Sequence, residues 1–169
     1  MSDEAFDTLM GSADPPLIVL TTAAEGERAG CLVGFHAQSS ITPPHYSVWL
    51  SKANHTYRVG LRAAHFAVHF LTAQDLALAE RFGTLTGEDT DKFAGVDFSL
   101  DEHGVPLLEA CPSRMSLERI AVLDDGGDHV CLTTRVSSAH TAEGFVPLRL
   151  SGADHLDPGH DSQERAVQP

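Results

Sequence analysis

The chain of 169 residues is poor in basic residues and in cysteine. It carries 11 Lys and Arg against 24 Asp and Glu, which gives a formal net charge of −13. A surface this acidic repels phosphate backbones, so nucleic acid is excluded as a general partner. Its three cysteines, Cys31, Cys111 and Cys131, are odd in number and widely spaced. This predicts neither a disulfide framework nor a zinc site.

Long apolar runs are also missing. None approaches the roughly 20 residues that a membrane span requires, and the acidic stretch from Met1 to Ala13 lacks the regions of a signal peptide. We therefore expect a cytoplasmic protein with no membrane partner and with reduced thiols. Length and composition predict one domain over 14–156. An arm or short helix over 1–13 precedes it, and a disordered tail over 157–169 follows, where apolar residues almost vanish.

Motifs of the common nucleotide-binding and hydrolytic folds are absent. No Gly-x-Gly-x-x-Gly follows a predicted strand, and the chain has neither a P-loop nor a Gly-x-Ser-x-Gly elbow. His65 and His69 are four residues apart in a predicted strand, with no third ligand suggested nearby. The sequence therefore predicts no metal site.

Short strands dominate what is present. β-Branched and aromatic runs predict strands over 17–22, 29–38, 46–50, 65–71, 114–123, 130–140 and 147–150, with short helices over 54–64 and 72–83. The sequence DDGGD at 124–128 favours a hairpin between the two long strands. One clear strand–helix–strand segment interrupts this order. We therefore expect an all-β-dominated fold, an antiparallel barrel with peripheral helices.

The segment Gly30–Pro44 is suited to a flat ligand. Its small residues let a ring approach the backbone, and Gln38, Ser39 and Ser40 offer hydrogen bonds to polar ring edges. A barrel strand that ends in a proline turn explains the same pattern.

The segment Ser51–Thr56 stands at a predicted helix start. Unpaired amides there favour phosphate, Lys52 adds a charge, and Asn54 and Thr56 add hydrogen-bond donors. An ordinary helix cap beside a solvated lysine is the alternative.

Two further segments are weaker. In Gly127–His129 the histidine suits a proton relay or a contact to a bound nucleotide, although turn chemistry alone explains the three residues. In Asp91–Val96, Phe93 suits ring stacking, but a helix end with one core aromatic explains the segment better when it is taken alone.

Taken in order, these segments resemble the flavin reductase family with the FMN-binding split barrel. That family typically has Gly-Met-Thr-Ala-Ser-Ser-Phe-Thr-Ser-Val-Ser-x-x-Pro-Pro, and Gly30–Pro44 matches it in place. The other matching stretches are Lys52–Thr56, Phe66–Leu71, Ala79–Phe82, Asp91–Gly95 and Gly127–His129, within a resemblance that runs from Pro16 to Leu150.

The resemblance implies an antiparallel split β-barrel that forms a homodimer with flavin at its interface. It implies NAD(P)H-dependent reduction of FMN or FAD, with NAD(P)H as co-substrate. The reduced flavin then either leaves to supply a partner monooxygenase or stays bound and reacts in place. The cofactor-binding residues carried over are Val33, Gly34, Phe35, His36, Gln38, Ser39 and Ser40 along the ring and ribityl chain, Ser51, Lys52, Asn54, His55 and Thr56 at the phosphate, and Phe93. His129 is carried over as the catalytic residue at the nicotinamide side, separate from the phosphate element.

The chain departs from the family pattern in three places. Leu32–Phe35 replace the family's hydroxyl-rich Thr-Ala-Ser-Ser, Asn54 replaces the phosphate-site serine, and the segment that begins at Arg149 lacks the family's tyrosine. Fewer hydroxyls predict fewer hydrogen bonds to ribityl and phosphate. A non-reductase binding protein is therefore the alternative, with a pocket repurposed for flavin, deazaflavin or haem; His36, His45 or His69 would be the axial ligand. A third possibility is a structural dimer whose pocket is degenerate and binds no chromophore.

Overall fold

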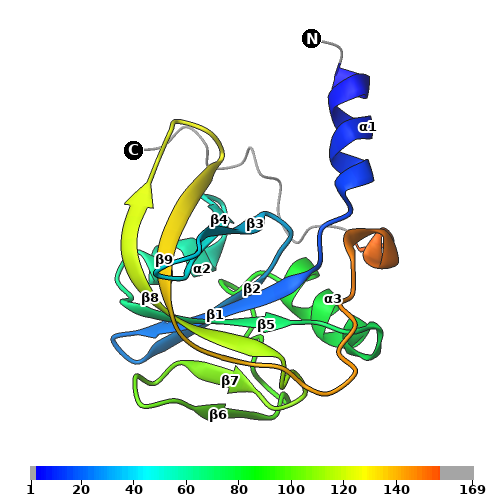
Figure 1. Ribbon diagram of the computed structural model, residues 1–169. Coiled ribbons are helices and arrows are strands. Elements are labelled where there is room, and N and C mark those ends of the chain that lie inside the picture. Colours follow the sequence, from blue (N-terminus) through cyan, green and yellow to red (C-terminus); the bar gives the residue numbers. More distant parts are fainter. Residues whose placement is uncertain (1–2, 157–169) are drawn as a thin grey trace.

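Seven antiparallel strands form one sheet that curls into a half-barrel (Figure 1). The computed structural model describes residues 3–156, so the tail predicted over 157–169 lies outside them. The sheet order is β2-β1-β5-β8-β9-β4-β3. The strands are β1 (Ile18–Ala24), β2 (Glu27–Val33), β3 (His36–Ser40), β4 (His45–Ser51), β5 (His65–Phe70), β8 (Arg114–Leu123) and β9 (His129–His140). The predicted mainly β, split-barrel architecture is confirmed.

The curl of the sheet follows from its two cores. Ile18 and Leu20 of β1 point inward and share one buried cluster with residues of β2, β4, β5, β8 and β9. Strands from opposite ends of the order thus meet inside the barrel. Val19, with the opposite orientation, joins a second cluster under α3 (Leu76–Thr84) that includes Phe82. Both faces of β1 are therefore buried, which explains its continuous apolar sequence.

The strand predicted over 29–38 is two strands. β2 pairs with β1, and β3 pairs with β4 at the other end of the sheet order. Between Val33 and His36 the chain crosses from one end of the order to the other, and the carbonyl of Phe35 accepts a hydrogen bond from Trp49 N at 2.9 Å. This crossing draws the two ends of the sheet together. Strand periodicity alone carries no signal for it, because both halves remain extended.

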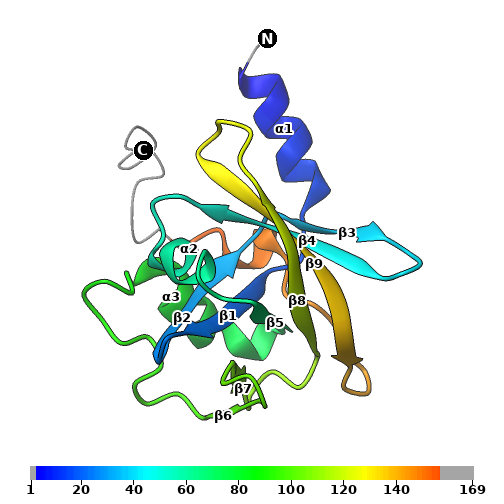
Figure 2. The same cartoon turned by 90° about the vertical axis from the view of Figure 1, so that its left-hand side faces the viewer.

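Two short helices cap the barrel where the sequence predicts them. α2 (His55–Gly60) is shorter than expected and has Asn54 as its N-cap. The helix predicted over 72–83 is a 3₁₀ turn, η1 (Ala73–Asp75), followed by α3. Thr72 caps η1 in a reciprocal capping box with Asp75. α2 packs on β1 and β2, and α3 packs on β2 (Figure 2).

The segments at the two ends of the domain differ in kind. α1 (Asp3–Ala13) projects away from the barrel and buries no side chain (Figures 1 and 2). The strand predicted over 147–150 is wrong: the chain there makes an isolated bridge between Pro16 and Arg149 and then enters η2 (Leu150–Ala153). Leu148 bonds to Leu17 on one side and to Leu71 on the other. It fills a gap between two strand ends and does not extend a ladder.

A small separate hairpin completes the fold. β6 (Phe98–Leu100) pairs with β7 (Pro106–Leu108) below the main sheet (Figure 1). Within residues 3–156, no helix is long and apolar enough to cross a membrane.

Candidate active site

A cavity of about 790 Å³ opens where the ends of β2 and β4 meet the start of β9. Its volume lies within the range of about 300–1,000 Å³ that is typical of small-molecule sites. Six of the residues predicted from sequence line it: Val33, Gly34, Phe35, Ser51, Asn54 and His129. The structure thus brings the first three predicted segments to one place, from three separate parts of the chain.

Several other wall residues were not predicted from the sequence. Trp49 lies on β4, Phe82 and Gly83 on α3, Pro15 before β1, and Leu150 at the start of η2. Each belongs to an element whose local pattern signals only packing. The curl of the sheet and the placement of α3 bring them together. A lone tryptophan among apolar residues was the one available hint.

Glycines shape the cavity wall in two different ways. A Cβ on Gly30 would lie 2.8 Å from the Phe82 ring, and one on Gly83 would lie 2.8 Å from Leu32. These two glycines let α3 pack closely on β2. A Cβ on Gly34, in contrast, would meet nothing nearer than Leu17 at 3.9 Å. Gly34 therefore leaves room in the cavity itself, as the small-residue pattern predicts.

Phe35 and His129 face each other at the cavity from different walls. Their ring centroids lie 5.1 Å apart with a 56° tilt, and Phe35 is 60% exposed. His129 Nδ1 lies 2.8 Å from Asp128 Oδ1. Since a carboxylate only accepts, Nδ1 carries the proton and donates, which leaves Nε2 for a ligand.

The phosphate element and the histidine hairpin are neighbours. Ser51 is the cross-strand partner of His129 in the β4–β9 ladder, and Lys52 N donates to the carbonyl of Asp128 at 2.9 Å. His129 belongs to the β8–β9 hairpin and the phosphate element follows β4 of the β3–β4 hairpin, so two different hairpins bring these residues side by side. The sequence does not predict the contact between Lys52 and Asp128, because β4 and β9 are far apart in the chain and pair only when the barrel closes.

Lys52 does not line the cavity wall. Its Nζ donates to Asp124 Oδ1 at 2.8 Å, and its side chain is 16% exposed. This bond lowers the pKa of Asp124 below its ordinary value, with help from the amide of Gly126. Lys52 therefore lies at the cavity's edge, already paired with an anion of the protein.

The polar groups at the start of α2 are largely used within the protein. Asn54 Oδ1 accepts from Thr56 N at 2.9 Å, and the Thr56 side chain is buried. His55 Nε2 lies 3.0 Å from Glu27 Oε1 and lines a different cavity. Of these three predicted residues, only Asn54 lines the main cavity.

The later part of the predicted ring-binding strand points elsewhere. Gln38 and Ser39 are exposed on β3, and Ser40 is half-buried; none of them lines the cavity. Ser39 Oγ accepts a hydrogen bond from Ser47 at 3.0 Å, and Gln38 donates to the carbonyl of Ser40. The crossing at Gly34 and Phe35 carries this strand to the outer edge of the sheet, away from the cavity.

Two of the three histidines named as haem ligands, His36 and His69, are hydrogen-bonded within the protein. Nε2 of His36 donates to the carbonyl of Pro16, and Nδ1 accepts from the Tyr46 hydroxyl, both at 2.6 Å. Burial lowers the pKa of His36. His69 is wholly buried and bonds to Val19 and Leu108 through its two ring nitrogens. His45 lies at the start of β4. No observation here favours haem.

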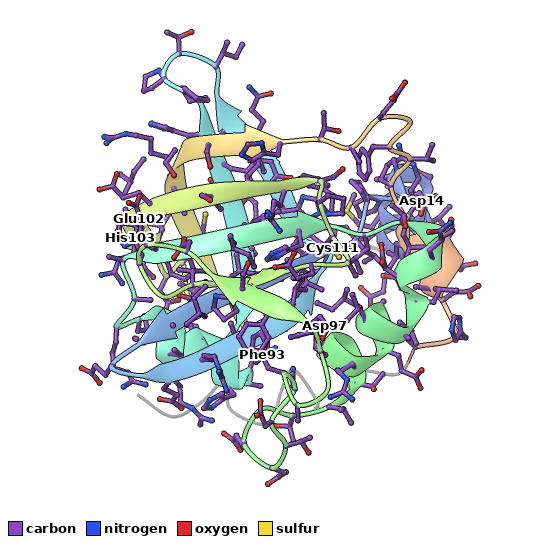
Figure 3. The ribbon with its side chains drawn as sticks, turned by 90° about the horizontal axis from the view of Figure 1, so that it is seen from below. Asp14, Phe93, Asp97, Glu102, His103 and Cys111 are labelled. Atoms are coloured by element: carbon purple, nitrogen blue, oxygen red, sulfur yellow. The ribbon has the colours of Figure 1, made fainter. Side chains whose placement is uncertain are left out.

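Phe93 belongs to the second core and a second, smaller cavity. It packs on Phe82 with ring centroids 5.3 Å apart and lines a cavity of about 340 Å³ beside Lys92. Figure 3 shows Phe93 in the view from below, together with His103 at the end of the β6–β7 hairpin. Lys92 is buried, donates to the carbonyls of Gly30 and Phe82, and has a pKa lowered by burial. The structure does not bring Phe93 to the main cavity.

The main cavity fits a flat, mostly apolar ring. Its walls are apolar around Gly34, Phe35 and Trp49, and its polar groups gather at Ser51, Asn54 and His129. An isoalloxazine has this character, with an apolar body and polar edges, and the missing Cβ of Gly34 leaves space for it. The residues present therefore fit a flavin.

Comparisons with known proteins agree with this geometry. The profile of the family described as "Flavin reductase like domain" matches residues 10–151. The chain is 30% identical to the reductase subunit HsaB of a flavin-dependent monooxygenase from Rhodococcus jostii, over 85% of this chain and 71% of that protein. It is 28% identical to the FMN reductase (NADH) SmoA of Agrobacterium fabrum, over 89% and 83%.

Solved structures share the fold. An NADH:FAD oxidoreductase from Streptomyces globisporus superposes with a TM-score of 0.79 at 22% identity, covering 89% of this chain and 90% of the other. The flavin reductase HpaC complexed with NADP+ gives a TM-score of 0.77 at 19% identity, covering 89% and 94%.

Proposed function

This chain belongs to the flavin reductase-like domain family, and from that premise we propose that it is an NAD(P)H-dependent oxidoreductase of FMN or FAD. The observation that carries the proposal is the cavity shared by Gly34, Ser51 and His129. It combines an apolar slot for a ring with a histidine at its opening. Relatives named FMN reductase (NADH) and reductase subunit of a flavin-dependent monooxygenase support the same activity.

The protein's part in the reaction is to bind and to orient. Bound flavin supplies the hydride acceptor, so the side chains need supply neither nucleophile nor obligatory base. Val33, Gly34 and Phe35 hold the flavin ring against the wall of β2. His129, fixed by Asp128, uses Nε2 to orient the nicotinamide nucleotide beside that ring. Apolar walls keep water from the space where the two rings meet.

The flavin phosphate is held at the start of α2. Lys52 supplies the charge, and Asn54, which lines the cavity, supplies a hydrogen bond from its side-chain amide. Thr56 is buried, and Lys52 must share or release Asp124 before it can meet a phosphate. The other residues carried over do not line this cavity: His36, Gln38, Ser39, Ser40, His55 and Phe93.

We further propose a homodimer. Phe35 is 60% exposed beside an open apolar cavity, and a second copy would cover both. The names of the relatives also support a partner monooxygenase that receives reduced flavin. A cytoplasmic location stays a prediction.

The test is NADH and NADPH oxidation by the purified protein with FMN or FAD as acceptor, followed without oxygen. We expect flavin to bleach in step with nicotinamide oxidation. Tight flavin binding without any reduction by either nucleotide would instead identify a binding protein.

A further inference from the structure

The lysine of the phosphate element is held by a carboxylate of the β8–β9 hairpin. Lys52 Nζ and Asp124 Oδ1 lie 2.8 Å apart. The Lys52 side chain is 16% exposed and that of Asp124 is 50% exposed, so the pair lies at the surface with its anionic end open to solvent. An ammonium already paired with a carboxylate offers little net charge to an incoming phosphate.

Asp124 is fixed in place by its own turn. Its Oδ1 also accepts a hydrogen bond from Gly126 N at 2.9 Å. On the other side, Lys52 N donates to the carbonyl of Asp128, so the backbone of Lys52 is attached to the same hairpin. The ion pair therefore joins two elements that are already in register, and its loss leaves the backbone contact intact.

We propose that Asp124 is an internal competitor of the flavin phosphate for Lys52, and that it thereby limits the preference for phosphorylated flavin over riboflavin. This rests on the proposed phosphate role of Lys52. A phosphate that approaches Lys52 must displace Asp124 or lie beside it, and two anions at one ammonium repel each other. The carboxylate thus weakens binding of FMN without touching the ring.

The test compares Asp124→Asn with Asp125→Asn by titration of FMN and of riboflavin at about 0.15 M salt, where distant charges are screened. Asparagine keeps an oxygen to accept from Gly126 N. Asp125 is the matched control, because it stands in the same turn and its Oδ1 accepts from Gly127 N at 3.1 Å instead. Both variants remove one negative charge, but only one removes the partner of Lys52.

We expect Asp124→Asn to tighten FMN about two- to fivefold, which is the range of an exposed ion pair. Riboflavin affinity stays unchanged, Asp125→Asn has a smaller effect, and the gain disappears in a Lys52→Ala background. Equal effects of the two variants, an equal gain for riboflavin, or a gain that survives Lys52→Ala would each overturn the proposal. The proposed function is judged separately, by whether the wild-type protein reduces flavin.

Discussion

Ser51 and His129 are cross-strand partners in the β4–β9 ladder, although 77 residues lie between them in the chain. Ser51 ends β4, directly before the proposed phosphate element, and His129 begins β9 and is the residue proposed to meet the nicotinamide nucleotide. Both line the same cavity. A ligand that reaches from Lys52 to His129 therefore lies along the end of the β4–β9 ladder. Because the two residues are so close, only substitutions can separate the proposed phosphate role of Lys52 from the proposed nicotinamide role of His129.

His129→Ala should raise the KM for NADH or NADPH about two- to tenfold, the worth of one hydrogen bond. The ring of His129 ends at the cavity, and its loss leaves the Lys52–Asp128 backbone contact in place. Flavin affinity should therefore change little. Steady-state kinetics and flavin titration check this together, and a parallel loss of flavin affinity would refute the nicotinamide assignment.

Lys52→Ala should weaken FMN about tenfold, the lower end of what a charge-assisted hydrogen bond contributes. The lower end applies because Asp124 already occupies the lysine. The difference from wild type should shrink at high salt. Riboflavin is the control: if its affinity falls in the same proportion, Lys52 acts through folding and not through the phosphate.

Gly34→Ala should affect flavin binding, whereas Gly30→Ala should affect the stability of the core. At Gly30 the new Cβ meets the Phe82 ring at 2.8 Å, so unfolding free energy should fall by about 1–3 kcal/mol. At Gly34 the Cβ enters open space in the cavity, so stability should hold while flavin affinity falls. Denaturant melts and flavin titration of both variants measure this. A stable Gly34→Ala protein with wild-type flavin affinity would show that the flavin ring binds elsewhere.

Stability should fall as the pH drops from about 6.5 toward about 4. Burial lowers the pKa of His69 to about 4, whereas an unfolded histidine titrates near its ordinary value. The unfolded state therefore binds the proton first, and each pH unit in this window costs at most about 1.4 kcal/mol. His69→Gln, which keeps an acceptor for Leu108 N, should flatten this part of the profile. An unchanged slope of stability against pH in His69→Gln would show that other groups cause the pH dependence.

The protein should be a dimer of the 18.1 kDa chain at micromolar concentration. The exposed Phe35 at the cavity mouth motivates this, since a covered mouth would shield an apolar ring from water. Light scattering gives the mass directly. A monomeric mass with full flavin affinity would contradict the interface.

Several strands of this chain could be predicted from its sequence, whereas the way in which distant segments assemble into the cavity could not. Alternating and β-branched residues identify β1, β5, β8 and β9. These depend on neighbours in sequence. The cavity depends on Gly34 and Phe35, where the chain crosses from β2 to β3, and this crossing places Gln38 outside the cavity.

The paired strands show the same limit. Nothing in the pattern of Ser51 names His129 as its partner, because the register of distant strands is set by barrel closure. Phe93 illustrates the opposite error: its ring packs in the core beside Phe82, as the alternative of a core aromatic predicts, although the chain at 92–95 is a turn and not a helix end.

The central claim is that flavin held in this cavity is reduced by NAD(P)H. Its most direct test is the rate of nicotinamide-dependent FMN reduction by the wild-type protein and by Gly34→Trp, whose indole would fill the open space beside Leu17. We predict turnover by wild type, and loss of both FMN binding and turnover in a Gly34→Trp protein that remains folded. Equal rates for the two proteins would contradict the account.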